Sequence, residues 1–360
     1  MSSRFIFVVC QSGAEAACKT ELQVNHPELK FSFSRPGFIT FKCDDESALT
    51  EKFHLKSVFA RTYGWSVGNS KSESLSNHVT ELMKAPQIKE VQHVHVWQRD
   101  ARLPGSSGFE PGATELAKQV GQELATVIKS ETGNEIVLNR NAKSDELVFD
   151  IAIVEPDHWF FGYHYATAKP QRWPGGVPNL KTETTAISRA YFKLKEALLW
   201  SGIHIQKDEL CAEIGSSPGG ACQLLLEKGA KVLAIDPAEM DPQVLEHENL
   251  THLRCRSKEA RKKDLRDVRW LVSDLSASPS YTLDAVEEIV SNQHVSHIRG
   301  LILTLKLTEL SLAKDVPAWI ERVKKMGFQM VKVRQLAFNR REICLVAARD
   351  RFALRASRKR

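Results

Sequence analysis

The chain has 360 residues, of which 42% are hydrophobic and 26% are charged, and its formal net charge is +6. This length exceeds what one hydrophobic core usually supports, so we expect two or three domains with the composition of a soluble protein. No apolar run approaches the roughly 20 residues that span a bilayer, and the first ten residues are too short and too quickly polar for a signal peptide. We therefore expect a cytoplasmic protein with no membrane partner.

The first 155 residues mix short strands with helices. Alternating runs of β-branched and aromatic residues predict strands at 4–10, 37–43, 57–67, 91–97 and 147–154. Apolar residues that recur every three or four positions predict helices at 14–22 and 114–129. This mixture predicts an α+β region.

Proline and glycine gather at two places and indicate the domain organisation. Residues 101–112 form a predicted loop, and residues 167–179 carry enough proline and glycine for a linker between domains. We therefore predict four parts of the chain, namely a small α+β domain at 1–55, a second domain at 56–168, a linker at 169–180 and a third domain at 181–360.

Beyond this linker, strands and helices alternate regularly. Strands are predicted at 210–214, 231–235, 270–274 and 300–306, and helices at 187–200, 222–229, 283–290 and 315–326. Such alternation predicts an α/β fold with a mostly parallel, Rossmann-like sheet that is covered on both faces. The last two strands, at 328–336 and 342–348, are too close in sequence for a parallel crossover, so we predict an antiparallel hairpin.

The first strand of this half leads into a glycine-rich segment, EIGSSPGG at residues 213–220. A glycine turn at this place lets the backbone approach a ligand, and the free N–H groups of the following helix favour an anionic partner. Asp236 ends the next strand, where its carboxylate can accept hydrogen bonds from two ribose hydroxyls. The spacing disfavours a nicotinamide site and excludes a P-loop. The alternative is a glycine turn that only packs helix against strand.

Two lysines and two acids lie at comparable places in this half. Lys193 lies in the first helix, Asp274 and Lys306 end neighbouring strands, and Glu342 begins the last strand. We expect all four at one edge of the sheet, although a solvated surface charge is the alternative for any single one. A lysine acts as a base only when its amine is neutral, and its usual pKa is about 10.4. Burial and a second cation would lower that pKa, so the set predicts one lysine as base and the other as its neighbour.

These residues resemble the motifs of the FtsJ-type ribose 2′-O-methyltransferases. The segment EIGSSPGG resembles the D-L-G-x-x-P-G-G loop that binds S-adenosylmethionine, with Glu213 in place of the usual Asp. SRAYFKLKE at residues 188–196 resembles the S-R-x-x-x-K-L-x-E helix of that family. The resemblance implies S-adenosylmethionine as cofactor, the methyltransferase variant of the Rossmann fold, and a catalytic tetrad with Lys306 as proton acceptor, completed by Lys193, Asp274 and Glu342.

The resemblance extends to a family of large-subunit rRNA methyltransferases. It is carried by the segments 11–22, 59–65, 161–166, 303–307 and 333–342. It implies 2′-O-methylation of a cytidine in 23S rRNA, with a THUMP-like RNA-binding domain at 56–168. It also implies a cofactor site lined by Ser188, Gly215, Ser217, Pro218, Gly219, Gly220, Asp236 and Asp274. Arg256 stands where that family has an acidic residue close to adenine, which removes the acceptor of the adenine amino group.

Other functions remain alternatives at this point. The same fold can serve as an inactive RNA-binding or ribosome-assembly factor, and Arg256 favours that hypothesis. The same tetrad also occurs in enzymes that act on tRNA and on mRNA caps, and a nicotinamide oxidoreductase is a more distant alternative. The basic segments 254–269 and 349–360 fit a polyanion, although a solvated charged face explains them equally well.

Aromatic, histidine and cysteine residues complete the set of candidates. Trp65, Trp97 and Trp159 could stack on bases, although core packing is the commoner role. His93 and His95 share a strand face but lack a third ligand, so we expect no metal. The seven cysteines contain no CxxC pair, which predicts reduced, structural thiols, and Cys222 beside the glycine loop is predicted to be a small buried residue rather than a nucleophile.

Overall fold

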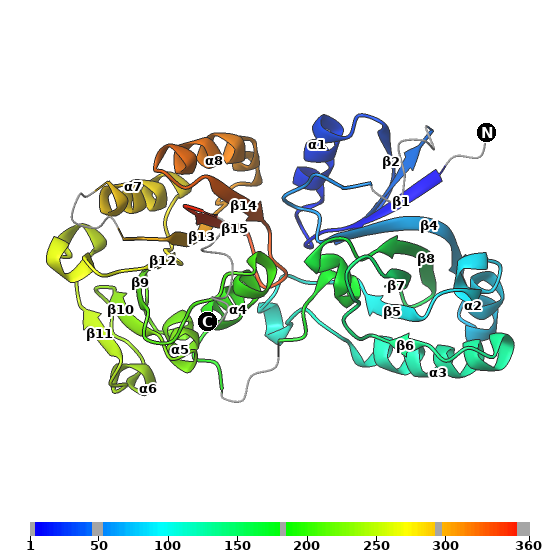
Figure 1. Cartoon of the computed structure of the whole chain (residues 1–360). Helices are drawn as coiled ribbons and strands as arrows, with labels where there is room; N and C mark the ends of the chain where they lie inside the picture. Colours follow the sequence, from blue (N-terminus) through cyan, green and yellow to red (C-terminus); the bar gives the residue numbers. More distant parts are fainter. Residues whose placement is uncertain (1–3, 45–52, 181–184, 292–296, 351–360) are drawn as a thin grey trace. The chain divides into compact units, whose positions relative to one another are not determined.

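The computed structural model describes residues 4–44, 53–180, 185–291 and 297–350. The chain divides into two compact units, Met1–Asn179 (unit 1) and Leu180–Arg360 (unit 2), and each unit is built on one sheet (Figure 1). Within the described residues, every helix is too short or too polar to cross a membrane.

An eight-stranded sheet forms the frame of unit 1. Its strands are β1 (Arg4–Val9), β2 (Leu29–Arg35), β3 (Phe38–Cys43), β4 (Thr62–Lys71), β5 (His93–Gln98), β6 (Val137–Leu138), β7 (Leu147–Glu155) and β8 (His158–Tyr165). They lie in the order β2-β3-β1-β4-β8-β7-β5-β6, and only β5 pairs in parallel, with β6 and β7. The sheet is therefore continuous across residues that we predicted to form two separate domains.

Three α-helices accompany this sheet, α1 (Glu15–Asn25), α2 (Leu75–Leu82) and α3 (Glu115–Thr132). Apolar residues of α2 and α3, including Leu82 and Leu124, are buried against Phe149 and Ile151 of β7. Thr114 caps α3 by accepting a hydrogen bond from Ala117 N, and Gly133 ends the helix at φ +75°. The predicted α+β character of unit 1 is thus confirmed, although α2, β2, β6 and β8 were not predicted.

The segment that we predicted as a linker is packed into unit 1 instead. It forms two short 3₁₀ helices, η4 (Lys169–Arg172) and η5 (Pro174–Gly176), in which Pro170, Gln171 and both glycines are buried. Gly175 lies so close to Trp97 that an added Cβ would stand 3.2 Å from the indole. The division between the units falls after this segment, because proline and glycine here serve close packing rather than flexibility.

A seven-stranded sheet forms the frame of unit 2. Its strands are β9 (Leu210–Ile214), β10 (Lys231–Ile235), β11 (Leu250–Leu253), β12 (Trp270–Ser273), β13 (Gly300–Lys306), β14 (Met330–Arg334) and β15 (Glu342–Ala348). They lie in the order β11-β10-β9-β12-β13-β15-β14, and β15 runs antiparallel to both of its neighbours. The predicted mostly parallel sheet with a terminal antiparallel hairpin is confirmed. Chain order reverses between β9 and β12, which is where ligands bind in such sheets.

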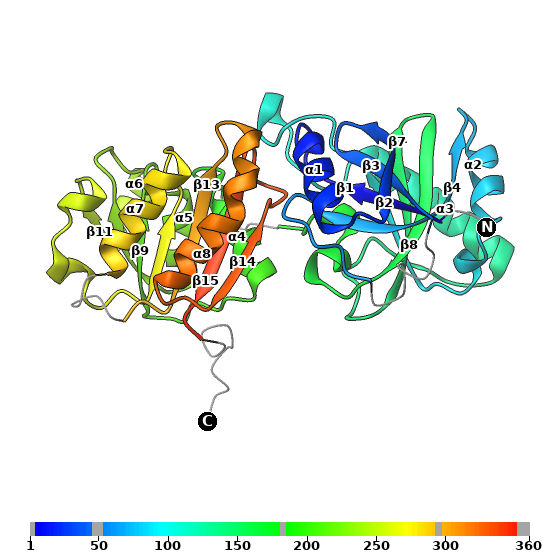
Figure 2. The same ribbon diagram turned by 90° about the horizontal axis from the view of Figure 1, so that it is seen from above.

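Helices cover both faces of this second sheet. They are α4 (Ala190–Ser201), α5 (Gly220–Glu227), the short α6 (Pro242–Leu245), α7 (Pro279–Val290) and α8 (Val316–Lys325). Helices α4 and α5 lie on one face, and α7 and α8 lie on the other (Figures 1 and 2). Ser278 caps α7 by accepting from Tyr281 N, and Pro279 occupies its first turn, as expected for a helix start. The two layers of helices leave the carboxyl ends of β9, β10, β12 and β13 at one edge.

A buried ion pair joins the sheet of unit 1 to the segment that follows it. His164 Nδ1 lies 2.5 Å from Asp150 Oδ2, and His164 Nε2 lies 2.6 Å from the carbonyl oxygen of Gln171. Because both partners are acceptors, the imidazole donates from both nitrogens and is positively charged. Burial alone would lower the pKa of His164, but the charge and hydrogen bond of Asp150 outweigh burial and raise it. Trp97 Nε1 donates to the other carboxylate oxygen of Asp150.

We predict that His164→Ala destabilises unit 1 by about 3–5 kcal/mol, because Asp150 is left as a buried charge without its cation. Since the folded pKa of His164 is raised, this stabilisation is complete below the unfolded pKa of about 6.5 and is lost as pH rises through the folded pKa. Urea unfolding followed by tryptophan fluorescence at acidic and alkaline pH measures it. The exposed His54 provides the control, as His54→Ala. An equal loss at both pH values would contradict a charged His164.

Candidate active site

Four charged side chains converge at the carboxyl edge of the sheet in unit 2. Lys193 comes from the first turn of α4, and Asp274 directly follows β12. Lys306 ends β13 and Glu342 begins β15, and the antiparallel register of these strands makes the two residues direct cross-strand partners. Such partners have neighbouring side chains. The structure therefore brings together all four residues of the predicted tetrad.

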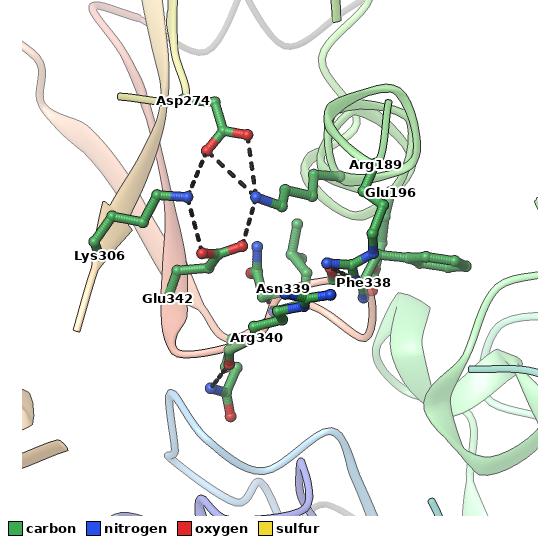
Figure 3. Close-up of polar contacts among 11 residues, drawn as sticks. Arg189, Glu196, Asp274, Lys306, Phe338, Asn339, Arg340 and Glu342 are labelled. Atoms are coloured by element: carbon green, nitrogen blue, oxygen red, sulfur yellow. Dashed lines mark hydrogen bonds and ion pairs between the residues drawn. The ribbon is translucent and has the colours of Figure 1, made fainter. Parts of the chain in front are cut away.

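The tetrad is a closed ring of alternating charge (Figure 3). Lys193 Nζ lies 3.1 Å from Asp274 Oδ2 and 2.6 Å from Glu342 Oε1. Lys306 Nζ lies 3.1 Å from Asp274 Oδ1 and 3.0 Å from Glu342 Oε2. Each ammonium thus bridges both carboxylates, so the ring carries no net formal charge. Lys306 has the most accessible side chain of the four, 21% exposed against 11% for Lys193, and it is the amine that a substrate can reach more readily.

Electrostatics within the ring correct one prediction. Burial lowers the pKa of Lys306, but the charges of Asp274 and Glu342 outweigh burial and raise it above its usual value. For both carboxyls burial acts in the other direction, yet the two lysines outweigh it and hold the pKa values of Asp274 and Glu342 below their usual range. We predicted that burial and a second cation would lower the pKa of the lysine base. Two carboxylates in direct contact exceed that effect, so this set of four residues alone keeps Lys306 protonated.

The glycine loop lies beside this ring and is closely packed. Gly215 follows β9 at φ +77°, and Gly219 adopts φ +118° at the start of α5, a backbone conformation that side chains rarely allow. A Cβ on Gly219 would stand 2.6 Å from Val244, and one on Gly220 would stand 2.2 Å from Ser188 Oγ. The loop therefore requires glycine at both places, and Ser188 lies against it as predicted. The Ser188 hydroxyl is buried and has no hydrogen-bond partner among the described residues.

Asp236 holds the loop to the neighbouring strand. It follows β10, and its carboxylate accepts hydrogen bonds from Ser217 N at 3.2 Å and from Ala238 N at 2.8 Å. Ser217 Oγ donates in turn to the carbonyl oxygen of Glu239 at 2.7 Å. Each carboxylate oxygen of Asp236 keeps a second lone pair that can accept from a hydroxyl. Pro218, which follows Ser217 in the loop, is exposed, whereas Gly219 and Gly220 are buried.

A buried pair of acidic groups lies behind the loop. Glu213 at the end of β9 is 1% exposed, and Cys222 Sγ donates to its Oε2 at 2.9 Å. Burial, together with the nearby carboxylates of Asp274 and Asp236, raises the pKa of Glu213 to about 8. Burial also raises the pKa of the Cys222 thiol well above its usual value, so Cys222 is not a thiolate. The predicted structural role of Cys222 is therefore confirmed.

Several other candidates from the sequence are buried or have contacts of their own. Trp65, Trp97 and Trp159 are buried in unit 1, which excludes them as exposed platforms for bases. His93 contacts Glu146 and His95 contacts the carbonyl oxygen of Arg140, and no group of metal-binding side chains occurs within the described residues. All seven cysteines are free thiols.

The basic segments differ in how much of them is described. Arg256, which stands where the resembling family has an acidic residue, is exposed. Its backbone N–H donates to the carboxylate of Glu259, so an acidic side chain lies next to this position although Arg256 itself is basic. Within the segment 254–269, Arg254 pairs with Glu239 and Arg261 pairs with Asp264. Of the second basic segment, residues 351–360 lie outside the described part of the chain.

Glu196 of α4 and Arg189, which directly precedes this helix, contact the site and were given no role in the sequence analysis. Glu196 and Arg189 hydrogen-bond to the loop between β14 and β15, directly before Glu342 (Figure 3). The sequence did contain a signal for Glu196, because this glutamate lies among apolar residues three positions after Lys193. A glutamate rarely occupies a buried helix position without a partner.

Comparison with known proteins gives a consistent result. Residues 186–352 match the FtsJ-like methyltransferase family. Ribosomal RNA large subunit methyltransferase M from Shewanella sediminis is 23% identical over 337 residues, which cover 88% of this chain and 88% of that protein. The protein of the same name from Xanthomonas axonopodis pv. citri is 24% identical over 355 residues, with coverages of 95% and 98%. The similarities to these two relatives extend over both units, whereas the family match lies within unit 2.

We predict that Glu342→Gln lowers the pKa of Lys306, because the substitution removes one of the two carboxylates that raise it. The measurement is an NMR titration of carbon-labelled lysine side chains. Lys325, exposed at the end of α8, serves as the internal reference. An unchanged Lys306 titration in the variant would show that Glu342 does not contribute to the ring in solution.

Proposed function

We propose that this chain, whose residues 186–352 belong to the FtsJ-like methyltransferase family, methylates a ribose 2′-hydroxyl of large-subunit rRNA with S-adenosylmethionine as methyl donor. The observation that supports the reaction most strongly is the ring of two lysines and two carboxylates beside a glycine loop. The support for the substrate is the similarity to rRNA methyltransferases over most of the chain.

Two features of the glycine loop support a cofactor site. Gly219 and Gly220 pack so closely against Val244 and Ser188 that no side chain fits there, and the buried Ser188 hydroxyl beside Gly220 has no hydrogen-bond partner among the described residues. We assign Ser188, Gly215, Ser217, Pro218, Gly219 and Gly220 to binding of the cofactor, Asp236 to its ribose hydroxyls, and Asp274 to both the cofactor site and the ring. Bound there, S-adenosylmethionine supplies a methyl group on a sulfonium, whose positive charge disfavours the protonated form of a nearby amine.

Lys306 is the proton acceptor in this proposal. The 2′-oxygen is a weak nucleophile until its proton is removed, and Lys306 is the more accessible of the two amines. Its neutral amine would take the proton from the hydroxyl as the oxygen forms its bond to the methyl carbon, while the bond from that carbon to the sulfonium sulfur breaks and leaves a neutral thioether. Asp274 and Glu342 then stabilise the resulting ammonium at 3.1 and 3.0 Å. Lys193 holds the two carboxylates from the opposite side and keeps their geometry fixed.

Unit 1 has a separate role in this proposal. We assign RNA binding to residues 1–179, in agreement with the sequence-based interpretation of residues 56–168 as a THUMP-like domain. The support is that the rRNA methyltransferases match this chain across both units. We also propose that the reaction takes place in the cytoplasm and that its target is a cytidine of 23S rRNA.

For Lys306→Ala we expect methyl transfer to protein-free large-subunit rRNA to be abolished, because Lys193, the other amine of the ring, is less accessible to a substrate. Affinity for S-adenosylmethionine, measured by calorimetry, should stay within a few-fold, which shows that the fold is intact. In the unsubstituted protein the single-turnover rate should rise with pH, since the raised pKa of Lys306 keeps its base form scarce. Lys325→Ala is the control for loss of one positive charge. Near-normal turnover of Lys306→Ala would rule out this role.

For Gly220→Ala we expect the affinity for S-adenosylmethionine to fall by on the order of tenfold or more, because overpacking of about 1–3 kcal/mol must displace Ser188 or the loop. Calorimetry measures this loss. Gly68→Ala is the matched control, since an added Cβ there meets nothing within 4 Å. Equal affinities of the two variants would argue against the loop as the cofactor site.

A further inference from the structure

Side-chain hydrogen bonds hold the backbone of the loop between β14 and β15 at several positions. Within residues 335–341, Ala337 N and Phe338 N donate to the two carboxylate oxygens of Glu196 at 2.9 and 3.0 Å. Leu336 N donates to Asn339 Oδ1 at 2.8 Å, and Gln335 Nε2 donates to the carbonyl oxygen of Arg340 at 3.1 Å. Side chains of the loop and of α4 thus bind its backbone at nearly every step.

The main anchor of this loop is a buried charge. Glu196 is only 1% exposed, and removing a carboxylate from water is unfavourable unless hydrogen bonds replace the lost water. Two parallel N–H donors provide that replacement. Arg189, the residue directly before α4, also binds the loop, because its Nη2 donates to the carbonyl oxygen of Phe338 at 2.7 Å. The ring of Phe338 also stacks on Phe192, with 5.5 Å between the centroids. Helix α4, which carries Lys193, therefore also fixes the conformation of the loop.

The loop ends in two arginines beside the tetrad. Arg340 and Arg341 are exposed, whereas the five preceding residues are buried. Leu307 N donates to the carbonyl oxygen of Arg341 at 2.7 Å, which extends the ladder of β13 and β15 one residue beyond the pair of Lys306 and Glu342. The backbone of Arg341 is therefore held at the same edge as the tetrad, one residue beyond the pair of Lys306 and Glu342.

We propose that Arg340 and Arg341 form a binding site for the backbone phosphates that flank the target ribose, and that Glu196 and Arg189 are positioning residues which hold this site against the tetrad. The inference rests on the proposed function. Within an RNA strand, a ribose 2′-hydroxyl is adjacent to the phosphodiester on the 3′-oxygen of the same ribose, so a strand that presents the hydroxyl to Lys306 brings phosphates to the neighbouring surface. Arginine is well suited to them, because its guanidinium binds phosphate oxygens through two parallel hydrogen bonds.

A purely structural loop is the alternative. In that case the contacts of Glu196 would serve only to place Glu342, and the exposed Arg341 would be an ordinary solvated charge. The two possibilities predict different responses to removal of one arginine, because only a phosphate contact changes the affinity for RNA and its dependence on salt.

The first experiment compares Arg341→Ala with Lys325→Ala. Lys325 is a matched control because it is basic, exposed and at the end of α8 that leads away from the tetrad edge. We expect the KM for protein-free large-subunit rRNA to rise on the order of tenfold in Arg341→Ala, with kcat and cofactor affinity nearly unchanged. The slope of log affinity for RNA against log salt should decrease in magnitude by about one. In Lys325→Ala both quantities should stay at the values of the unsubstituted protein.

The second experiment is a double-mutant cycle with Glu196→Gln. The amide of glutamine offers one acceptor where Glu196 offers two, so one of the two backbone N–H groups loses its partner. If Glu196 positions the arginines, Arg341→Ala should raise KM for RNA less than threefold in the Glu196→Gln protein, whereas independent residues would give the full tenfold effect again. Normal affinity for S-adenosylmethionine would show that the Glu196→Gln protein is folded. If that protein does not fold, the comparison of Arg341→Ala with Lys325→Ala alone decides whether the phosphate site exists.

The outcomes separate this inference from the function on which it rests. If the unsubstituted protein methylates rRNA but Arg341→Ala and Lys325→Ala have the same KM and salt slope, the phosphate site is refuted and the proposed function stands. If the unsubstituted protein binds the cofactor and transfers no methyl group to rRNA, the function fails and the phosphate site with it.

Discussion

The ring of alternating charges formed by Lys193, Asp274, Lys306 and Glu342 is the interaction on which the site depends. Four partly buried ionic groups are stable together only because each ammonium contacts both carboxylates, and loss of one member would leave an uncompensated charge. The ring also fixes the relative positions of α4, β12, β13 and β15, since each contributes one side chain. Its geometry therefore serves stability and chemistry at once.

The same ring places a condition on catalysis. Because Asp274 and Glu342 raise the pKa of Lys306, these residues by themselves hold the proposed base in its inactive, protonated form. An additional positive charge at this edge lowers that pKa, and the glycine loop beside the ring is the place where a sulfonium would be bound. Under the proposed function, activation of Lys306 as a base would therefore depend on the bound cofactor.

Much of this unit follows from residue patterns. Apolar strands that alternate with amphipathic helices predict the sheet, and a connection too short for a crossover predicts the antiparallel hairpin that makes Lys306 and Glu342 direct partners. The sign of the pKa shift of Lys306 was predicted wrongly, because it depends on contacts of 3.0 and 3.1 Å that no spacing in the sequence reveals. The roles of Glu196 and Arg189 depend in the same way on the tertiary contact of α4 with a distant loop.

Unit 1 shows where local patterns fail. Strand β2 has the sequence LKFSFSR, whose alternation of apolar and polar residues indicates a strand that we did not predict, and most of its residues are exposed. Residues 167–179 contain proline and glycine for close packing on Trp97 and Arg61, and composition alone cannot distinguish that use from a flexible linker. The tryptophans were ambiguous in the sequence, because an aromatic side chain can either stack on a base or pack in a core. In the structure these tryptophans are buried in the core of unit 1.

The most direct measurement is the chemical position of a transferred methyl group. The protein is mixed with methyl-labelled S-adenosylmethionine and protein-free large-subunit rRNA, and the product RNA is hydrolysed in alkali. A methyl group on the 2′-oxygen blocks cleavage of the adjacent phosphodiester, so the account predicts that the label appears in an alkali-resistant dinucleotide. Label released in a mononucleotide would place the methyl group on a base, and would contradict the role of the ring as an activator of a ribose hydroxyl.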